Sequence, residues 1–372
     1  MKVLFCVRHN FYDAPGGAQI QIVKTKKYLE EIGVICDLTT TPFNVNYNQY
    51  DILHLTDLTW VYDNLIYFKE IEKQQFKGKK VLSTIYWPFD DYASKGAPLF
   101  QKIIFKLFGI NGFEKLKALG KFILKNEKIY LQGLKNTFIK NQRDIVNKVD
   151  FLLPNSELEL KSLNLRLSVN LDNYMVVNNA IDTKVFDEIS LNNKNNKEDN
   201  LIVFVARIDQ RKNQLNFLKS MLNSDYKILF IGNPGPNSKK YYHNLKEMAN
   251  QRGNVSFISH ISQEEVFKYM LKAKVHVLTS WIETPGLVSI EAAYAGCNIV
   301  VSDKGSVRDY FKEYAFYCDP ENINSIKEAV DNAMSNKNNN NDEFINQIRE
   351  EYTWENTAKQ TLKAYKKVLD EG

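Results

Sequence analysis

The chain has few cysteines, no long apolar run and no strong excess of one charge. Its four cysteines stand singly, without the CxxC spacing of disulfide frameworks or zinc sites, so we expect reduced thiols. The first apolar run ends at Arg8, too soon for a signal peptide, and no later run has the length of a membrane span. We therefore expect a cytoplasmic protein.

Two kinds of ligand are also not expected. The formal net charge of +5 is modest for 372 residues and gives no reason to expect a nucleic acid partner. Gly16 and Gly17 follow the first apolar run, but the GxGxxG fingerprint and its acidic partner are absent, which argues against a nicotinamide cofactor. Two interpretations of the double glycine remain open: a tight turn, or backbone that comes close to a ligand.

Strand patterns alternate with helical patterns along most of the chain. Runs rich in β-branched and aromatic residues fit strands that are buried on both faces and joined by crossover helices. The runs begin at Val3, Asp51 and Val81 in the first half, and at Leu201, Lys227, Asn254, Val275 and Asn298 in the second. A chain of this length with 44% hydrophobic residues can fill two cores. The predicted fold class is α/β, with two doubly wound domains of parallel strands.

A polar stretch separates the two series of strands. Residues 187–200 read DEISLNNKNNKEDN and have little to bury, so we expect the linker between the domains there. A second Asn-rich run begins at Asn336, and neither run carries recognisable chemistry.

The motif ETPGLVSIE is the strongest functional signal, because it leads from an apolar strand into a helix. Glu283 at the strand end and Glu291 in the helix can both face the carboxyl edge of a parallel sheet. The N–H groups of Gly286, Leu287 and Val288 at the helix start suit a diphosphate. Glu291 has apolar neighbours and needs partners, which two ribose hydroxyls would supply. A structural arginine or lysine is the alternative, and the neighbouring Glu283 and glycine favour the ribose.

A second signal is the cationic turn in FVARIDQRKNQ. Arg207, Arg211 and Lys212 follow an apolar strand and lie just before a helix. Arg207 and Lys212 can therefore bind the same anion. Together they would stabilise the charge that develops on a leaving diphosphate. Cations at a sheet edge are often merely solvated, but three so close together favour an anion site.

These segments together resemble glycosyltransferase family 4, whose members have the GT-B architecture of two Rossmann-like domains facing a central cleft. ETPGLVSIE matches the E-x7-E motif, ARIDQRKN the phosphate-binding pair and PGGA the N-terminal glycine loop. VVNNAID resembles the hinge, and the last helical pattern resembles the helix that crosses back. The resemblance implies an acceptor-binding domain at 1–182, joined by helix 353–372, and a nucleotide-sugar-binding domain at 183–352.

The resemblance also implies roles for single residues. Glu291 would hold the donor ribose, Glu283 the sugar hydroxyls, Arg207 and Lys212 the diphosphate, and Gly17 the backbone beside it. Arg207, Lys212 and Glu283 are thus the expected catalytic residues of a retaining hexosyltransferase in surface polysaccharide or lipopolysaccharide biosynthesis. Family members need no metal cofactor, because side-chain cations replace it, and the lack of a DxD sequence at a suitable strand end agrees with that.

The chain departs from the family pattern at several positions. Members commonly have a histidine near the reacting sugar where this chain has Tyr86 and Trp87. His9 and His54 are available, although a lone histidine is more often structural. Ala180 replaces a usual glycine in the hinge.

Two further positions concern the donor. Asn213 stands in the phosphate loop where glycine is commoner, a change that looks tolerable. The nucleotide base is expected around His260 and Ile261, after the strand that begins at Asn254.

Residues 100–148 form a helical, lysine-rich segment with interleaved Phe, Ile and Leu. Two interpretations remain open: contact with an anionic membrane surface, or ordinary core helices with basic polar faces. The first implies a lipid-linked acceptor at the inner face of the cell membrane, and the second leaves a soluble glycan acceptor. Aromatic residues near strand ends, Trp60, Tyr86, Trp87 and Phe89, could stack on sugar rings.

Two rival functions fit the same scaffold. A nucleotide-sugar epimerase would change the donor without an acceptor, and a non-catalytic sugar-nucleotide-binding subunit would bind the donor without turnover.

Overall fold

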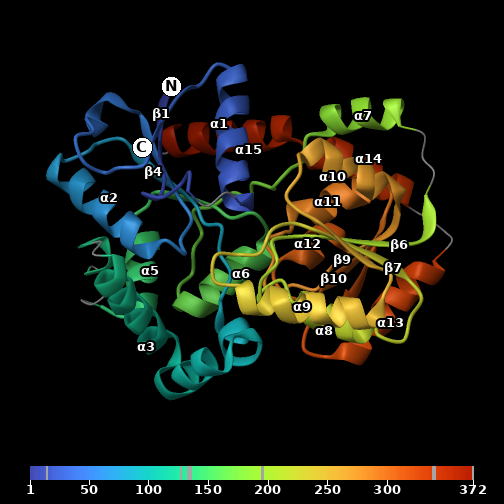
Figure 1. The fold of residues 1–372 in the computed structure, drawn as a ribbon. Helices are drawn as coiled ribbons and strands as arrows, with labels where there is room; N and C mark the ends of the chain where they lie inside the picture. Colours follow the sequence, from blue (N-terminus) through green and yellow to red (C-terminus); the bar gives the residue numbers. More distant parts are fainter. Residues whose placement is uncertain (14–15, 126–127, 132–135, 194–196, 337–340, 371–372) are drawn as a thin grey trace. The chain divides into compact units, whose positions relative to one another are not determined.

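The computed structural model describes residues 1–13, 16–125, 128–131, 136–193, 197–336 and 341–370 (Figure 1). The chain divides into two compact units. Unit 1 comprises Met1–Asp90, Leu99–Asn179 and Trp354–Gly372, and unit 2 comprises Asp91–Pro98 and Ala180–Thr353.

Unit 1 is built on a five-stranded sheet in which every pairing is parallel, with the order β2-β1-β3-β4-β5. Its strands are β1 Lys2–Cys6, β2 Ile35–Thr39, β3 Ile52–Thr56, β4 Lys79–Ser83 and β5 Phe151–Leu153. Its helices are α1 Gly17–Glu31, α2 Val61–Lys73, α3 Leu99–Lys125, α5 Phe138–Val146, α6 Glu157–Leu167 and α15 Trp354–Asp370, with short 3-10 turns at Tyr47–Gln49 and Lys128–Leu131.

Unit 2 has a six-stranded parallel sheet with the order β11-β10-β9-β6-β7-β8. Its strands are β6 Glu198–Val205, β7 Lys227–Ile231, β8 Val255–Ile258, β9 Ala273–Leu278, β10 Asn298–Ser302 and β11 Ala315–Cys318. Its helices are α7 Thr183–Asn192, α8 Gln214–Ser220, α9 Lys239–Arg252, α10 Gln263–Lys272, α11 Leu287–Tyr294, α12 Val307–Phe311, α13 Ile323–Ser335 and α14 Asn341–Glu351, with a π-helical turn at Tyr92–Gly96. Two doubly wound parallel units confirm the predicted fold class.

The eight strands expected from apolar runs are all present. Central strands such as β3 and β10 are buried along their whole length, as expected for a sheet covered on both faces. Strands β2, β5 and β11 were not predicted, and each lies at an edge of its sheet. Strands β2 and β11 are only partly buried and therefore carry a weaker apolar signal, as Asp37 in β2 illustrates. Strand β5 is buried along its whole length but has only three residues, too few for a clear pattern. The four cysteines are buried and form no disulfide, as expected.

The predicted linker at residues 187–200 is wrong where the structure describes it. Residues 187–192 are the end of helix α7, and 198–200 begin strand β6. The apolar stripe of α7 holds the helix on unit 2: Ile189 is buried, and the Phe186 ring stacks on Phe267 with 4.1 Å between ring centroids. Residues 194–196 and 337–340 in the two Asn-rich runs lie outside the described residues.

Helix α15, near the end of the chain, belongs to unit 1, where it lies beside α1 (Figure 1). Its Tyr365 hydroxyl lies 2.5 Å from Nδ1 of His54, whose Nε2 is 2.8 Å from the Ser83 hydroxyl. Burial lowers the pKa of His54 to about 3, so this ring is neutral. His54 therefore packs inside the unit and is not a site residue.

A short segment from the first half of the sequence belongs to unit 2. Asp91–Pro98 is attached by an Asp91–Lys304 pair at 2.6 Å and a Lys95–Glu321 pair at 3.0 Å. Gly96 packs so closely that an added Cβ would lie 2.5 Å from the Trp281 ring. The range 1–182 expected for the first domain included this segment, which neither carries a strand nor shows an apolar run.

Candidate functional site

The site in unit 2 lies where its strand order reverses. Strands β6 and β9 are neighbours, but the chain moves to opposite sides of the sheet after them. In open α/β sheets such a switch point forms a crevice at the carboxyl ends of the strands. Arg207 and Lys212 follow β6, and Glu283 follows β9, so these three predicted residues come from the two loops that flank the switch point.

Lys212 and Glu283 form an ion pair across the switch point. Both side chains are largely buried, at 15% and 10% exposed, so the charges interact with little solvent screening. Behind them His276 is held neutral: burial, with the Lys212 charge as a second cause, lowers its pKa to about 3. The resemblance assigned Lys212 to the diphosphate and Glu283 to the sugar hydroxyls. In the structure the two side chains contact each other as an ion pair.

Arg207 is oriented by a neighbouring carboxylate. Its Nε donates to Oδ2 of Asp209 at 2.7 Å, and Oδ1 of Asp209 accepts the backbone N–H of Lys212 at 3.1 Å. The Arg207 side chain is about half exposed. Asp209 thus ties the arginine and the lysine turn into one rigid loop, and the guanidinium can offer two further nitrogens to an anion.

Helix α11 begins at the same edge of the sheet. Its N-cap is Gly286, whose φ of 86° lies in the left-handed region that glycine tolerates. The first N–H groups of a helix have no partner within it, so those of Leu287 and Val288 can bind an anion. An added Cβ at Gly286 would lie 3.5 Å from Oε2 of Glu283, which shows how close the helix start is to the Lys212–Glu283 pair.

Glu291 is one of the two predicted carboxylates, and its partner is an amide. Nε2 of Gln263, the first residue of α10, donates to Oε1 of Glu291 at 2.5 Å. Glu291 is 9% exposed, and burial raises its pKa to about 7 although the Gln263 bond lowers it. The predicted alternative, a structural cation, is not the partner that the structure shows.

Gln263 is a site residue that the sequence analysis missed. A capping box between Ser262 and Glu265 places the start of α10 just after β8. This signal is visible in the sequence, but it says nothing about which neighbour Gln263 meets. Ile261, expected near the nucleotide base, lies two residues earlier and packs against the core of unit 2.

Asn213 stands where glycine is commoner in the family that the chain resembles, and its backbone conformation shows why asparagine fits there. Its φ of 66° is left-handed, a region that asparagine enters more readily than most residues. Its side chain donates to the Pro320 carbonyl at 2.8 Å and so fixes the start of α8.

The loop after β10 supports the backbone of Glu283. Gly305 has a φ of 89°, and an added Cβ would lie 1.8 Å from the Glu283 carbonyl oxygen. Ser306 donates its N–H to that same oxygen at 3.1 Å. The position of Glu283 therefore depends on glycine at 305.

We expect Gly305→Ala to lower the transfer rate by about tenfold or more, because a shift of Glu283 of the order of 1 Å disturbs a positioned group. Gly253→Ala is the matched control, since Gly253 also has a left-handed φ, 73°, but nothing within 4 Å of an added Cβ. Both glycines have a left-handed φ, and only at Gly305 would the added Cβ meet a neighbouring atom. Initial rates and thermal midpoints of both check this, and equal rates would show that the loop does not position Glu283.

The residues predicted in unit 1 are placed less decisively. Gly16 is the N-cap of α1 with an extended φ of 179°, and nothing lies within 4 Å of an added Cβ. Gly17 begins the helix. Tyr86, which stands in place of the family histidine, is buried and therefore unsuited to stacking on a sugar.

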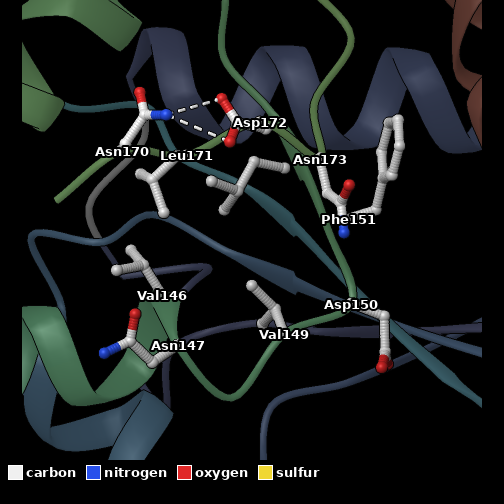
Figure 2. A pocket seen from close by; sticks show the side chains of 10 residues that line it. Val146, Asn147, Val149, Asp150, Phe151, Asn170, Leu171, Asp172 and Asn173 are labelled. Carbon is white, nitrogen blue, oxygen red and sulfur yellow. Dashed lines mark hydrogen bonds between the residues drawn. The ribbon is translucent and has the colours of Figure 1, made fainter.

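Two hollows in the described part of unit 1 are lined by none of the predicted site residues. Figure 2 shows one in unit 1, with a volume of about 310 Å³, between the end of α5 and the start of β5. Asn170 there donates to both carboxylate oxygens of Asp172, at 2.9 and 3.0 Å. The described residues contain no cluster of three or more potential metal ligands.

The chain is similar to known glycosyltransferases. Residues 185–351 match the family model described as "Glycosyl transferases group 1". Among curated proteins, the chain is 26% identical over 231 residues to an N-acetylgalactosaminyltransferase of Campylobacter jejuni, which acts on N-acetylgalactosamine-N,N'-diacetylbacillosaminyl-diphospho-undecaprenol. It is 27% identical over 183 residues to an uncharacterised glycosyltransferase of Methanocaldococcus jannaschii. The matches cover 59% and 46% of this chain and 58% and 46% of those relatives, so the chain spans about half their length.

Solved structures share the whole fold at low sequence identity. Sucrose-phosphate synthase from Thermosynechococcus elongatus superposes with a TM-score of 0.74 at 15% identity, and the match covers 100% of both chains. Anabaena HepE in complex with UDP-glucose superposes with a TM-score of 0.68 at 12% identity, again over 100% of both chains.

Proposed function

We propose, from the match of residues 185–351 to the model of the glycosyl transferases group 1 family, that the chain moves a hexose-type sugar from a nucleotide-sugar donor to a glycan or lipid-linked acceptor. The proposal includes retention of anomeric configuration, independence of metal ions and a role in surface polysaccharide or lipopolysaccharide biosynthesis. The observation that carries it is the arrangement at the switch point of unit 2, where the Lys212–Glu283 pair, Arg207 and the start of α11 flank one sheet edge.

Each group has a part in donor binding. The Glu291 carboxylate accepts hydrogen bonds from the two ribose hydroxyls, and the Ile261 side chain lies against the base. Arg207, Lys212 and the first N–H groups of α11 bind the diphosphate. Glu283 holds the Lys212 ammonium in place with one oxygen and is available to a sugar hydroxyl with the other.

The chemical step depends mainly on charge. When the bond between the sugar C1 and the diphosphate oxygen breaks, the electron pair leaves with the diphosphate, which gains negative charge. Arg207 and Lys212 stabilise that charge from positions that are fixed before the reaction, so no metal ion is needed. The acceptor hydroxyl oxygen then bonds to C1 on the face that the diphosphate leaves, and its proton passes to the departing diphosphate oxygen. Attack on this face preserves the anomeric configuration.

A transfer assay tests this proposal directly. Purified protein is incubated in EDTA with UDP-, GDP- and ADP-linked hexoses and a polyprenyl-diphosphate N-acetylhexosamine. Mass spectrometry identifies the product, and the NMR coupling constant of its anomeric proton gives the configuration. We expect a product with the donor's configuration. Donor consumption without an acceptor product would favour an epimerase, and inversion would refute the proposed geometry.

Helix α3 supports a lipid-linked acceptor. The helix is kinked at Gly109, whose φ of 59° is not helical, and after the kink Ile110, Phe113 and Ala118 are buried in unit 1, as the core-helix interpretation requires. Yet nine large apolar side chains between Leu99 and Leu124 are more than a third exposed, and lysines are interleaved among them. Apolar groups that enter an interface beside lysines suit an anionic membrane surface. Within the described residues, no helix has both the length and the apolarity to cross a bilayer.

The Campylobacter relative acts on a diphospho-undecaprenol-linked substrate, which is consistent with such an acceptor. We therefore propose peripheral contact of α3 with the inner face of the cell membrane. The contact would bring the protein to an acceptor that is confined to the bilayer.

We expect Leu107→Ser/Phe108→Ser to weaken binding to phosphatidylglycerol-containing vesicles by about tenfold or more, because each side chain contributes about 1 kcal/mol or more when buried. Leu107 and Phe108 are 70% and 58% exposed, so folding should not suffer. Leu191→Ser in unit 2, at an apolar residue that is 87% exposed, is the control. Vesicle co-sedimentation measures the change. If both variants bound the anionic vesicles equally well, α3 would not be the contact surface. If the wild type bound only vesicles of pure phosphatidylcholine, the surface would not favour anionic lipid.

A further inference from the structure

A glutamine and a buried glutamate meet at the nucleotide site proposed for unit 2. Nε2 of Gln263 donates to Oε1 of Glu291 at 2.5 Å. Gln263 is the first residue of α10 and Glu291 lies in α11, and the two helices pack against each other (Figure 1). The proposed function assigns a ligand to Glu291 but no part to Gln263.

A capping box fixes the place of Gln263. The Ser262 hydroxyl accepts the backbone N–H of Glu265 at 3.2 Å, and the Glu265 carboxylate accepts the backbone N–H of Ser262 at 3.4 Å. Helix α10 therefore begins at a defined residue. The Gln263 residue is exposed whereas Glu291 is 9% exposed, so their bond lies at the boundary between solvent and the interior of unit 2.

The bond acts against the effect of burial on Glu291. Burial raises the pKa of this carboxyl to about 7, and the Gln263 bond lowers it. Without the amide the pKa would lie higher, so that the carboxyl would be mostly protonated at neutral pH. A protonated carboxyl donates at one oxygen and offers fewer acceptor sites, so it binds a pair of hydroxyls less well.

The titratable groups on the elements around Glu291 have other roles. Helix α11 packs against β9, β10, α10 and α14, and β10 contains no titratable residue. His276 on β9 is neutral, because burial lowers its pKa to about 3. Glu265 on α10 belongs to the capping box, and Nε of Arg349 on α14 donates to the Tyr294 hydroxyl at 2.9 Å. Burial and the amide are the causes of the shifted Glu291 pKa.

We propose that Gln263 is a positioning residue for the ribose: its amide keeps the Glu291 carboxylate ionised and oriented, so that unit 2 binds ribonucleotides in preference to 2′-deoxynucleotides. The assignment rests on the proposed function. Ribose offers a pair of neighbouring hydroxyls, and an ionised carboxylate can accept from both. The deoxy sugar offers one hydroxyl of this pair and gains less, so the preference depends on the charge that Gln263 maintains on Glu291.

The experiment measures nucleotide binding as a function of pH. Titration calorimetry gives the Kd of UDP, GDP and ADP and of their 2′-deoxy counterparts for the wild type, Gln263→Met, Gln263→Lys and Gln251→Met. Methionine keeps the length of the side chain without its N–H donors, and lysine replaces the amide by a cation. Gln251, an exposed glutamine of helix α9, is the matched control.

The two variants at Gln263 should move the pH dependence in opposite directions. Wild-type affinity for a ribonucleotide should fall as the pH drops through about 7, where Glu291 becomes protonated. Gln263→Met should raise this midpoint by about one pH unit and weaken binding at neutral pH by about fivefold, in line with the loss of a hydrogen bond to a charged group. Gln263→Lys should lower the midpoint, and Gln251→Met should follow the wild type. Titration of the nucleotide phosphates is common to all variants and cancels.

Two further comparisons show whether Gln263 acts through Glu291. Gln263→Met should reduce the preference for ribonucleotides, because 2′-deoxynucleotides depend less on the carboxylate. Added to Glu291→Gln, it should change the Kd by no more than about twofold, since the charge on which it acts is already gone.

A purely structural role of Gln263 would lower the thermal midpoint, leave the pH midpoint of binding unchanged and persist in the Glu291→Gln background. That result, or an unchanged preference for ribonucleotides, would overturn the inference while the proposed function stands. Failure of the wild type to bind any of these nucleotides would overturn both. If binding responds to Gln263 as expected but no sugar is transferred from any donor, the inference stands and the proposed function fails.

Discussion

Replacing Lys212 by alanine is expected to lower the rate of sugar transfer by about 100-fold or more, which is the usual loss when a group facing a developing anion is removed. Lys212 is one of the two cations proposed to bind the diphosphate, and Glu283 fixes its ammonium in a largely buried position. The loss should appear in kcat more than in the donor KM, because the charge on the diphosphate grows as the bond to C1 breaks. Steady-state kinetics at saturating acceptor measures both.

Two further variants separate catalysis from folding. Lys212→Ala leaves the Glu283 carboxylate buried without its cation, which also destabilises the protein. Lys212→Ala/Glu283→Gln removes that charge, so the thermal midpoint should recover while the rate stays low. Lys219→Ala, at an exposed lysine of the adjacent helix α8, controls for loss of a positive charge. Near-normal turnover of folded Lys212→Ala would contradict its role.

The second large effect is expected from Glu291→Gln, which should weaken nucleotide binding yet stabilise the protein at pH 8. The neutral amide keeps the shape and the bond from Gln263, but it cannot accept two ribose hydroxyls as a carboxylate does. We expect the nucleotide Kd to rise by about tenfold or more, in line with the loss of a hydrogen bond to a charged group. Titration calorimetry measures this.

The stability change follows from the raised pKa of Glu291, about 7 in the folded chain against 4.5 for an ordinary glutamate. Between these values the folded state binds the proton that the unfolded state has lost, so wild-type stability falls as pH rises from 4.5 to 7. The glutamine variant lacks this loss. At pH 8 it should be more stable by as much as about 3 kcal/mol, since each pKa unit corresponds to about 1.4 kcal/mol.

Urea unfolding at pH 4.5 and pH 8 checks the sign. The difference between the two proteins should shrink towards pH 4.5, where Glu291 is protonated in the folded state. Glu159 in unit 1 is another buried carboxyl with a pKa of about 7, but it is present in both proteins and cancels. A glutamine variant that is less stable at pH 8 would show that the carboxylate of Glu291 stabilises the fold instead of serving a ligand.

Much of the candidate site in unit 2 could be predicted from sequence, because the end of an apolar strand is a local property of the chain. Once the apolar runs that end before Arg207 and Glu283 are taken as parallel strands, their following residues must lie on one edge of the sheet. The pairing of these side chains could not be predicted. Which oxygen Lys212 meets depends on rotamers, and the Gln263–Glu291 bond joins residues on different helices.

The errors have physical causes as well. The segment 187–200 was expected to have little to bury, yet Ile189 within it is buried together with Phe186 just before it, and these two side chains attach helix α7 to the core of unit 2. His9 could be singled out as a candidate but not assigned, because its partner Asp63 lies 54 residues away and no periodicity connects them. Pairs of side chains that are far apart in the sequence cannot be predicted from local sequence patterns.

Unit 2 is proposed to bind a nucleotide-sugar through its own side chains. The most direct test is a thermal-shift screen of the wild type and Glu291→Ala against UDP, GDP, ADP, CMP and their common sugar conjugates, in EDTA. We predict that one nucleotide family raises the midpoint of the wild type, and that the shift is lost in the variant. No shift with any nucleotide, or a shift that requires a divalent metal, would contradict the account.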